Sequence, residues 1–393
     1  MEVAKPQTKR SNRILLLVTQ ADWGGVQSFL IRFCDSMMRE GRDVLLAAGG
    51  EGELWKEAEK KGIPIRRLKH TTREINPIKD FQAVLEIKKL INEFRPDAVH
   101  LNSSKMGVIG SIASHMSAKK PWTVYRIGGW AFKEPLSAWK RWIYQTTERL
   151  TAKFKDVIIL VHPGDAEIAP MLGIRPRHWY VTVPNGLEVK NFISQLLTKA
   201  EARQILQLPE HAFVFGTVAN AYATKGLISY LDVLDRVLKE DRNSYAVIIG
   251  DGPEFEELKK KQKKSESGDR IILTGHRDDA SALYPAFNVF VLPSRKEGMP
   301  WTILEAMCAS LATVATDVGA CKWMLTGSPD GDAGLIVPKD DPLSLAIAMR
   351  RLRTNEEERL SLSSAAYATL SKRFSWSNTL KGNTDALDKV APV

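Results

Sequence analysis

The sequence predicts an α/β fold with two Rossmann-like, doubly wound domains that face each other across a cleft. Three observations predict it. Short apolar runs typical of buried parallel strands alternate with amphipathic helical stretches, which favours crossover connections. The alternation pauses between residues 191 and 210 and then starts again. A length of 393 residues also fits two or three domains of about 100–200 residues each.

The N-terminal domain is predicted over residues 1–190. Its apolar runs predict strands at 13–19, 44–48, 63–68, 98–101, 122–127, 157–161 and 181–183. Helical periodicity predicts helices at 28–40, 54–61, 81–94, 108–116 and 138–154. Arg95-Pro96 is expected to stop the third of these helices, because a residue before proline disfavours the helical conformation.

The second domain is predicted over residues 191–375, with a linker near 191–210. Strands are expected at 213–218, 246–249, 271–274, 289–292, 312–315 and 335–337, and helices at 227–239, 254–265, 280–285, 301–310, 343–353 and 356–374. The final segment, 376–393, is long enough to cross back to the first domain. Glycines expected just after strands, at the ligand-facing edges of both sheets, are those at 24–25, 128–129, 216, 226, 250–252, 275 and 298.

Positive charge is concentrated in the N-terminal half. Residues 1–190 contain 31 Lys and Arg against 20 Asp and Glu, a net charge of +11, whereas the remainder carries −1. This predicts an acidic partner for that half, such as an anionic membrane surface or a phosphate-bearing acceptor. No nucleic-acid recognition motif accompanies the charge. The basic, aromatic helix at 138–154 suits either a membrane interface or a packed crossover helix with an exposed basic side.

The cysteines and the apolar runs indicate the compartment. Cys34, Cys308 and Cys321 lack metal-site spacing and predict a reducing compartment without disulfides. No apolar run approaches the ~18 residues that span a bilayer. The first twelve residues are polar and lack an apolar signal core. We therefore expect a cytoplasmic protein, with contact at the inner face of the membrane as a further expectation.

Two glutamates eight positions apart stand in the segment 288–319, which is predicted as strand, loop, helix and strand. Glu297 is expected in the loop, and Glu305 in the helix that Pro300 can start. The helix start offers N–H groups to an anion, and carboxylates accept hydroxyl hydrogen bonds well. A sugar phosphate or nucleotide sugar fits this pattern. The alternative is a solvated loop glutamate and a helix-surface glutamate.

Lys225-Gly226 precedes the helix predicted at 227–239. Lysine is a point charge suited to phosphate, and the helix N-terminus adds N–H donors. The dipeptide by itself equally allows a lysine on the protein surface.

The segment S-R-K-E-G-M-P-W-T-I-L-E-A-M, residues 294–307, resembles the two-glutamate signature of retaining GT-B glycosyltransferases of family 4, the glycosyl transferases group 1. This family includes many bacterial capsule and lipopolysaccharide transferases. The resemblance runs from about residue 13 to about residue 376 and implies the GT-B form of the predicted fold. Further matching segments are W-G-G-V-Q (23–27), H-L-N-S-S-K (100–105), P-N-G (184–186), F-G-T-V-A-N-A-Y-A-T-K-G (215–226), G-D-G-P (250–253) and T-G-H-R (274–277).

The resemblance implies a role for each matching position. Lys225 would bind the donor diphosphate, Glu305 the ribose hydroxyls, and Glu297 the sugar hydroxyls near the reacting centre. The positions assigned to catalysis are Asn102, Arg126, Gly128, Lys225 and Glu297. The donor-binding positions are Gly24, Gly25, Asn220, Lys225, Gly250, His276, Arg277, Glu297, Gly298, Met299, Pro300, Trp301 and Glu305.

Two polar positions depart from the family pattern. Asn220 replaces an arginine of the phosphate clamp, for which Arg277 or Arg295 are candidate substitutes. Asn102 replaces the second histidine of an H-x-H strand end.

A third departure is Gly128, in Y-R-I-G-G-W-A-F (125–132), where the family often has a histidine that contacts the transferred sugar. The change implies a different donor sugar, a role passed to Arg126 or Asn102, or loss of activity. The sequence leaves these three open.

The resemblance implies transfer of a sugar from a nucleoside diphosphate sugar to a glycan or lipid-linked acceptor, with retention of anomeric configuration, in cell-surface polysaccharide synthesis. UDP is the family's commonest donor nucleotide, and neither a cofactor nor a metal is expected. Two alternatives stay open. A nucleotide-sugar epimerase needs acid and base groups in the cleft, and no matching arrangement is found. A non-catalytic sugar-nucleotide-binding protein is suggested by Gly128 and Asn220.

Overall fold

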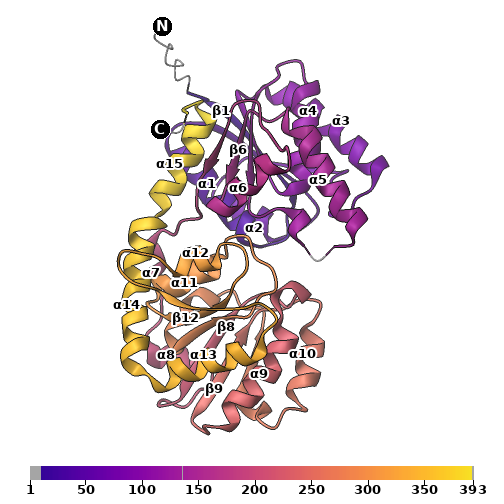
Figure 1. Ribbon diagram of the computed structural model, residues 1–393. Coiled ribbons are helices and arrows are strands. Elements are labelled where there is room, and N and C mark those ends of the chain that lie inside the picture. Colours follow the sequence, from indigo (N-terminus) through magenta and orange to yellow (C-terminus); the bar gives the residue numbers. More distant parts are fainter. Residues whose placement is uncertain (1–9, 135, 392–393) are drawn as a thin grey trace. The chain divides into compact units, whose positions relative to one another are not determined.

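The computed structural model describes residues 10–134 and 136–391; residues 1–9, which include most of the segment without a signal core, lie outside the described part (Figure 1). The chain divides into two compact units. One comprises the described residues up to Pro184 together with those from Asn378 onward, and the other is Asn185–Ser377. The boundaries expected from the sequence lie at 190/191 and 375/376.

The first unit contains, among its described residues, a seven-stranded parallel sheet ordered β3-β2-β1-β4-β5-β6-β7. Its strands are β1 (Arg13–Gln20), β2 (Asp43–Gly49), β3 (Ile65–Leu68), β4 (Ala98–Asn102), β5 (Trp122–Ile127), β6 (Val157–Leu160) and β7 (Trp179–Thr182). The chain moves outward from β1 to β3 and restarts at β4 on the other side of β1. The strand order therefore reverses between β1 and β4, which is where open α/β sheets bind ligands.

Helices connect these strands. They are α1 (Gly25–Arg39), α2 (Glu53–Lys60), α3 (Pro77–Phe94), α4 (Ser104–Met116), the 3-10 turn η1 (Ala131–Lys133), α5 (Ala138–Ala152) and α6 (Pro163–Met171). The start of α3 is set locally, because the Asn76 side chain accepts a hydrogen bond from the Lys79 N–H at 3.1 Å and Pro77 takes the first helical position. The helix ends before Arg95-Pro96, as predicted.

The second unit contains, within the described chain, a six-stranded parallel sheet ordered β10-β9-β8-β11-β12-β13. Its strands are β8 (Phe213–Val218), β9 (Ser244–Ile249), β10 (Ile271–Gly275), β11 (Val289–Leu292), β12 (Ala312–Thr316) and β13 (Gly334–Val337). Here the strand order reverses between β8 and β11. Two parallel sheets of this kind in one chain confirm the predicted α/β class with two Rossmann-like domains.

The helices of the second unit begin soon after Asn185. They are α7 (Val189–Ile193), α8 (Lys199–Ile205), α9 (Leu227–Lys239), α10 (Phe255–Gln262), α11 (Trp301–Cys308), α12 (Cys321–Leu325), α13 (Pro342–Thr354) and α14 (Glu356–Arg373), with 3-10 turns η2 (Ala223–Lys225), η3 (Gly268–Arg270) and η4 (Ala280–Ala286). The segment 191–210 was expected to be a linker, but it holds part of α7 and all of α8. The reason is local: Thr198 and Glu201 form a reciprocal capping box at the start of α8.

Two of the glycines expected just after strands lie within strands, Gly216 in β8 and Gly275 as the last residue of β10. Gly216 lies inside β8 and not after it. A Cβ at this position would lie 2.1 Å from the ring of Phe287. The glycine therefore admits an aromatic ring against the strand and is part of the core of the second unit.

Each unit has its own apolar core beneath its point of strand reversal. In the first unit Leu15 and Leu17 of β1 belong to one buried cluster with Leu101 of β4. In the second unit Val291 of β11 and Val314 of β12 are buried in another. Full burial of one such side chain contributes about 1.5–3 kcal/mol. The loops that leave these strands therefore start from rigid positions.

The last helix, α15 (Trp376–Leu387), brings the C-terminal residues into the first unit. The Trp122 indole N–H donates to the carbonyl oxygen of Ala386 at 2.9 Å. The Arg42 guanidinium donates to both carboxylate oxygens of Asp388, each at 2.8 Å. The later part of α15, yellow in Figure 1, lies beside the first sheet.

Two structural observations concern the features from which the compartment was expected. In the part of the chain that the structure describes, no helix combines the length and the apolar character needed to cross a membrane. Cys34, Cys308 and Cys321 are buried, free thiols.

Candidate functional site

The predicted residues of the second unit lie in loops at the reversal of its strand order. The loop after β8 carries Asn220 and Lys225, and the loop after the neighbouring strand β11 carries Glu297. Helix α11 follows and carries Glu305. The topology thus brings residues far apart in the sequence to one edge of the sheet, at the position where such sheets hold ligands.

Lys225 and Glu297 form an ion pair at this edge. Lys225 Nζ lies 2.7 Å from Glu297 Oε1, and the Ser294 hydroxyl donates to the same oxygen at 2.6 Å. The side chain of Glu297 is 8% exposed and that of Lys225 is 25% exposed. Because both groups are largely withdrawn from water, their electrostatic interaction is stronger than that of a surface pair. The pair holds the ammonium group in one place.

The lysine loop and the glutamate loop are bonded to each other. The backbone N–H groups of Arg295 and Lys296 both donate to the carbonyl oxygen of Thr224, at 2.8 and 3.2 Å. Gly226 has φ +67°, and a Cβ there would lie 2.6 Å from the Pro293 carbonyl oxygen. Only glycine allows this backbone contact without strain. The two loops therefore behave as one piece.

Gly319 supports the glutamate loop from the strand β12 side. Its φ is +55°, and a Cβ would lie 2.4 Å from the carbonyl oxygens of both Glu297 and Gly298. The next residue, Ala320, donates its N–H to the Gly298 carbonyl oxygen at 2.7 Å. Gly319 was not among the predicted site residues, and its close approach to Glu297 depends on the fold.

Glu305 has a fixed orientation on α11. Its Oε2 accepts a hydrogen bond from the Tyr284 hydroxyl at 2.7 Å. Tyr284 is buried, and burial together with the Glu305 carboxylate raises the pKa of the phenol well above its ordinary value. The phenol therefore stays protonated and donates. Tyr284 was not among the predicted site residues.

Asn220, Gly250 and His276 lie in the loops that follow β8, β9 and β10. Gly250 has φ +142°, and a Cβ would lie 2.1 Å from the Ala219 carbonyl oxygen. Its N–H donates to Gly275 O at 2.9 Å, which joins the loops after β9 and β10. Asn220 and His276 are exposed on these joined loops.

The two arginines considered as substitutes for the arginine absent at position 220 already have protein partners. The Arg277 guanidinium binds both oxygens of Asp279 at 2.7 Å, and this hydrogen bonding raises the pKa of Arg277. The Arg295 side chain donates to Asp340 and to Ser229, each at 2.9 Å. Lys225 is therefore the cation that stands beside Glu297.

Gly298, Met299, Pro300 and Trp301 form the entry to α11, which begins at Trp301 with Pro300 as its first flanking residue. The buried Asn185 holds this entry, since its side-chain N–H donates to the Met299 carbonyl oxygen at 2.8 Å. The Pro-Asn-Gly segment was noticed in the sequence, but this contact was not predicted.

In the first unit, Gly24 and Gly25 lie where β1 leads into α1. Gly25 is the first residue of α1, whose first turn carries neither an acidic residue nor a side-chain cap. The ends of β1 and β4 are joined here, because the hydroxyl oxygens of Thr19 and Ser103 lie 2.5 Å apart. Ser103 also caps α4 by accepting from the Met106 N–H at 3.4 Å. The helix starts that follow the two central strands thus lie at the reversal point of the first sheet.

Asn102, the last residue of β4, belongs to a buried hydrogen-bond chain. Its Nδ2 donates to His100 Nδ1 at 3.0 Å, and His100 Nε2 donates to Asn383 Oδ1 at 3.2 Å. Burial, with the charge of Arg126 as the second cause, lowers the pKa of His100 to about 3, so this ring is neutral at neutral pH. Asn102 Oδ1 has no hydrogen-bond partner among the described residues.

Arg126 lies opposite Asn102 on the neighbouring strand β5. It is 3% exposed, and burial lowers its pKa to about 9. The guanidinium carbon lies 4.1 Å from the centre of the Phe29 ring. Asn102 and Arg126 are thus brought together at one edge of the first sheet, and Gly128 follows β5 at the same edge.

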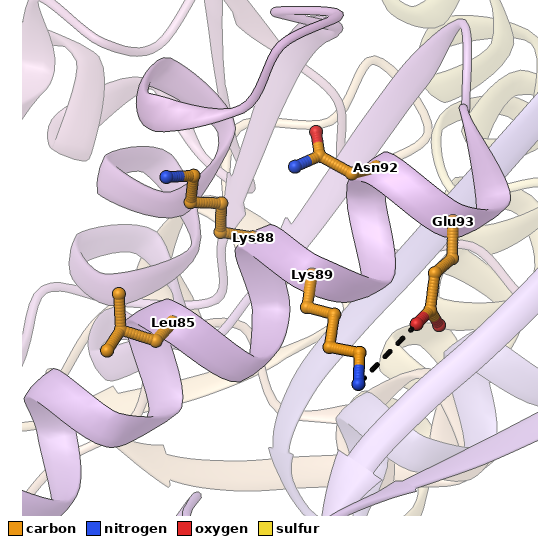
Figure 2. A pocket seen from close by; sticks show the side chains of 5 residues that line it. All are labelled: Leu85, Lys88, Lys89, Asn92 and Glu93. Carbon is orange, nitrogen blue, oxygen red and sulfur yellow. Dashed lines mark ion pairs between the residues drawn. The ribbon is translucent and has the colours of Figure 1, made fainter.

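The surface also has hollows, one of which lies away from the predicted residues. One, of about 420 Å³, runs along α3 and is lined by Leu85, Lys88, Lys89, Asn92 and Glu93 (Figure 2). Lys89 and Glu93 pair across one helical turn at 3.8 Å. Because all five side chains come from one helix and none is a predicted site residue, this hollow does not carry the chemistry.

Another hollow, of about 370 Å³, adjoins the bonded loops of the second unit. Its lining includes Gly226, Pro293 and Arg295. The backbone that holds Lys225 and Glu297 is therefore open to a cavity beside the sheet edge.

Two family models match the chain. One, described as a glycosyl transferase 4-like domain, matches residues 24–186, and the other, described as glycosyl transferases group 1, matches residues 212–355. The second range contains Lys225, Glu297 and Glu305.

Curated relatives match over half or more of the chain. The UDP-Gal:alpha-D-GlcNAc-diphosphoundecaprenol alpha-1,3-galactosyltransferase of Escherichia coli is 30% identical over 263 residues, which cover 66% of this chain and 67% of that protein. The lipopolysaccharide core biosynthesis mannosyltransferase LpsB of Rhizobium meliloti (strain 1021) is 33% identical over 208 residues, which cover 50% of this chain and 58% of LpsB.

Similarity in fold extends over nearly the whole chain. The crystal structure of Anabaena Alr3699/HepE in complex with UDP and glucose matches with a TM-score of 0.79 at 19% identity, covering 96% of this chain and 99% of that one. At this identity the similarity shows the fold alone.

Proposed function

This chain belongs to the glycosyl transferases of group 1, and on that premise we propose that it transfers a sugar from a UDP-type nucleoside diphosphate sugar with retention at the anomeric carbon. The proposed acceptor is a glycan or a lipid-linked sugar of cell-surface polysaccharide synthesis. The name of the E. coli relative contains UDP-Gal and an undecaprenol-linked acceptor, which supports the proposed donor and the proposed acceptor. We propose the GT-B arrangement for the two units on the same family grounds.

The observation that carries the proposal is the Lys225–Glu297 pair at the reversal of the second sheet. A cation and a carboxylate 2.7 Å apart suit a ligand that has phosphates at one end and hydroxyls at the other. Lys225 stabilises the negative charge that develops on the departing diphosphate. Glu297 accepts hydrogen bonds from hydroxyls of the sugar near the reacting carbon.

The other residues of the second unit bind the rest of the donor in this proposal. Glu305, oriented by Tyr284, accepts the ribose hydroxyls. The entry to α11, from Gly298 through Met299 and Pro300 to Trp301, offers backbone N–H groups to the phosphates. The joined loops that carry Asn220, Gly250, His276 and Arg277 approach the nucleotide base.

The first unit supplies groups for the transferred sugar. Gly24 and Gly25 let the backbone at the start of α1 approach the donor phosphates and sugar. Asn102 and Arg126, at the ends of β4 and β5, take over polar contacts at the transferred sugar. In the reaction the bond between the anomeric carbon and the diphosphate oxygen breaks, and the acceptor oxygen bonds to that carbon on the same face. The departing phosphate takes up the acceptor proton.

We propose that Lys225 and helix N-termini, and not a bound metal ion or other cofactor, stabilise the departing diphosphate. Among the described residues no group of three or more His, Cys, Asp or Glu side chains is arranged to hold a metal ion. The positive charge beside Glu297 is that of Lys225.

The two alternatives from the sequence are a nucleotide-sugar epimerase and a non-catalytic binding protein. The matching family models and the named relatives are glycosyl transferases, which favours transfer over both. The chain is therefore treated as an enzyme of the glycosyltransferase class.

A direct assay of transfer tests the proposed function. Wild-type protein is incubated with labelled UDP-galactose or UDP-glucose and a short-chain lipid-diphosphate sugar, with and without EDTA, and the product anomer is identified by NMR. We expect an α-linked product from the α-linked donor and undiminished turnover in EDTA. Conversion of the donor sugar without acceptor would point to an epimerase, and binding without any product would point to a non-catalytic protein.

The acceptor's membrane location is supported by exposed side chains of the first unit. Ile78 and Phe81 of α3 are 73% and 61% exposed, and Trp139 and Trp142 of α5 are 62% and 64% exposed. Helix α4 packs against both α3 and α5, so the two helices flank one side of the unit (Figure 1). The exposed Lys140 lies between the two tryptophans. We propose that this side contacts anionic lipid at the inner, cytoplasmic face of the membrane.

Vesicle flotation tests the membrane contact. The protein should float with vesicles of anionic lipid at low salt and be released at high salt. A tryptophan buried in the interface contributes about 1.5–3 kcal/mol, so the double variant Trp139→Ser, Trp142→Ser should bind at least about tenfold more weakly. Met171→Ser, at an 83% exposed position on α6, is the matched control and should bind normally. Equal binding by all three proteins would disprove the contact.

A further inference from the structure

A chain of side-chain hydrogen bonds connects the C-terminal helix α15 with the end of β4. Asn383 Oδ1 lies 3.2 Å from His100 Nε2, and the other ring nitrogen of His100 lies 3.0 Å from Asn102 Nδ2. Asn383 and His100 are fully buried, and Asn102 is 1% exposed. All three belong to the first unit, because that unit includes the chain from Asn378 onward. The helix therefore reaches, through one ring, a residue of the candidate site.

Backbone carbonyl groups determine how both amides point. Asn383 Nδ2 donates to the Thr379 carbonyl oxygen at 2.8 Å, so the side-chain oxygen of Asn383 faces His100. Asn102 Nδ2 donates to the carbonyl oxygens of Leu17 and His100, at 3.4 and 3.2 Å. An amide turned the other way would place oxygen against oxygen, where no hydrogen bond forms. His100 Nε2 must therefore donate to Asn383, and His100 Nδ1 must accept from Asn102.

The same contacts disfavour the protonated form of His100. An imidazolium donates from both nitrogens, and its Nδ1–H would meet the N–H of Asn102. The ring is also faced by Phe29 and Phe33 of α1, with ring centres 6.3 and 5.3 Å away, and by the charged Arg126 of β5. No acid is among these neighbours. Burial, followed by the positive charge of Arg126, lowers the pKa of His100 to about 3. The ring is therefore neutral and carries its proton on Nε2.

The consequence appears at Asn102. Its Nδ2 is committed to His100 and to two backbone carbonyl oxygens, which leaves Oδ1 to point elsewhere. This oxygen has no hydrogen-bond partner among the described residues. Asn102 is the last residue of β4, at the reversal of the first sheet, where open α/β sheets hold ligands. A buried oxygen without a donor is unfavourable, so a hydroxyl group that donates to it gains binding energy.

We propose that Asn383 is a positioning residue, which acts through His100 to hold Asn102 with its side-chain oxygen ready to accept a hydrogen bond from a hydroxyl group of the substrate. The inference rests on the proposed function, in which Asn102 makes a polar contact with the substrate. It adds the C-terminal helix to the parts of the chain that the reaction needs, although Asn383 itself contacts no substrate.

Nitrogen NMR of the wild-type protein tests the hydrogen-bond chain without any measurement of activity. With ¹⁵N-labelled histidine, and with the His100 signal assigned from its loss in His100→Gln, the ring should stay neutral with its proton on Nε2 from about pH 8 to about pH 5.5. An unperturbed histidine, with a pKa of about 6.5, becomes protonated in this range. A proton on Nδ1, or protonation of the ring within the range, would overturn the inference.

The variant Asn383→Asp tests the positioning role. Its carboxylate has the shape of the amide but favours the imidazolium and raises the pKa of His100. The protonated ring needs an acceptor at Nδ1, so Asn102 should turn its oxygen toward the ring and its N–H toward the substrate. The normal orientation is present above the raised pKa and is lost as the pH falls through it. Relative to wild type, kcat/KM should therefore fall by about tenfold or more between pH 8 and pH 5.5.

Asp388→Asn is the matched control. It weakens the docking of the same C-terminal segment, because Asp388 pairs with Arg42 at 2.8 Å, but it lies outside the chain through His100. Its pH profile should run parallel to that of the wild type. A fall in kcat/KM shared by this control would show that docking alone matters and would overturn the inference, as would a parallel profile for Asn383→Asp.

The outcomes separate this inference from the proposed function. Wild-type protein that transfers sugar from no UDP-sugar would overturn the proposed function and the positioning role that rests on it. The NMR result would still stand, because the orientation of Asn102 is measured without substrate.

Discussion

Glu297→Ala is expected to abolish sugar transfer, with kcat at least about a hundredfold lower. The carboxylate sits at the reversal of the second sheet and is held by Lys225 and the Ser294 hydroxyl. The loop of described residues 293–298 is hydrogen-bonded to Thr224 and packs against Gly319. Within this range Glu297 is the only acidic residue. Its removal takes away the acceptor for the sugar hydroxyls and leaves Lys225 without its partner. Steady-state kinetics with the donor sugar would measure the loss.

The fold should survive this change. The loop backbone is held by hydrogen bonds to Thr224 and by the packing of Gly319, and neither needs the carboxylate. Glu256→Ala is a matched control, because that carboxylate pairs with Lys259 at 2.9 Å on the exposed helix α10. The Glu256→Ala variant should keep full activity. Near-normal turnover by Glu297→Ala would refute the assigned role, and a large loss in the Glu256 control would show that the assay reports stability.

Lys225→Ala is expected to lower kcat/KM by about 10²–10³-fold. The Lys225 side chain is 25% exposed and its ammonium group is positioned by Glu297, so it is ready for the diphosphate without rearrangement. The charge on the departing group grows in the transition state, and the loss should therefore appear in kcat as well as in KM. Arg277 and Arg295 should not compensate, because Asp279 and Asp340 hold their guanidinium groups.

A double-mutant cycle examines whether the ion pair works as one unit. Lys225→Ala and Glu297→Ala remove groups in direct contact, so their effects on kcat/KM should be less than additive. Lys259→Ala on α10 is the matched lysine control and should leave transfer unchanged. Fully additive effects would mean that the two residues act on the substrate independently. A small effect of Lys225→Ala would remove this residue from the diphosphate site.

The strands could be predicted because their signal is local. The apolar run 289–292 predicted both ends of β11 correctly, and Arg95-Pro96 predicted the end of α3. Helix α6 was not predicted, because Pro163 and Gly164 favour a turn when only the local sequence is considered. The structure shows His162 capping this helix, with its ring nitrogen accepting from the Gly164 N–H at 3.1 Å. Such a cap depends on the conformation of one side chain, and helix propensities calculated from the sequence carry no information about that conformation.

The candidate site was predicted residue by residue, but its contacts were not. Lys225 and Glu297 are 72 positions apart, and they meet because β8 and β11 are neighbours in the sheet. Tyr284 gave no sequence signal for its bond to Glu305. The surroundings of Gly128, where no atom lies within 4 Å of the place of a Cβ, also needed coordinates, because a sequence does not tell a glycine that is required by the backbone from one that is not. The roles of these residues stay predictions for the experiments above.

The return of α15 to the first unit has a consequence for how the protein is made. Translation delivers all of Asn185–Ser377 before the residues from Asn378 onward leave the ribosome. The second unit can therefore complete its fold while the first sheet still lacks Asp388 for Arg42 and Asn383 for His100. The first unit therefore completes its folding last, although most of its residues are synthesised first. A nascent chain stalled near its C-terminus would hold one mature unit and one that still exposes buried polar groups to chaperones and proteases.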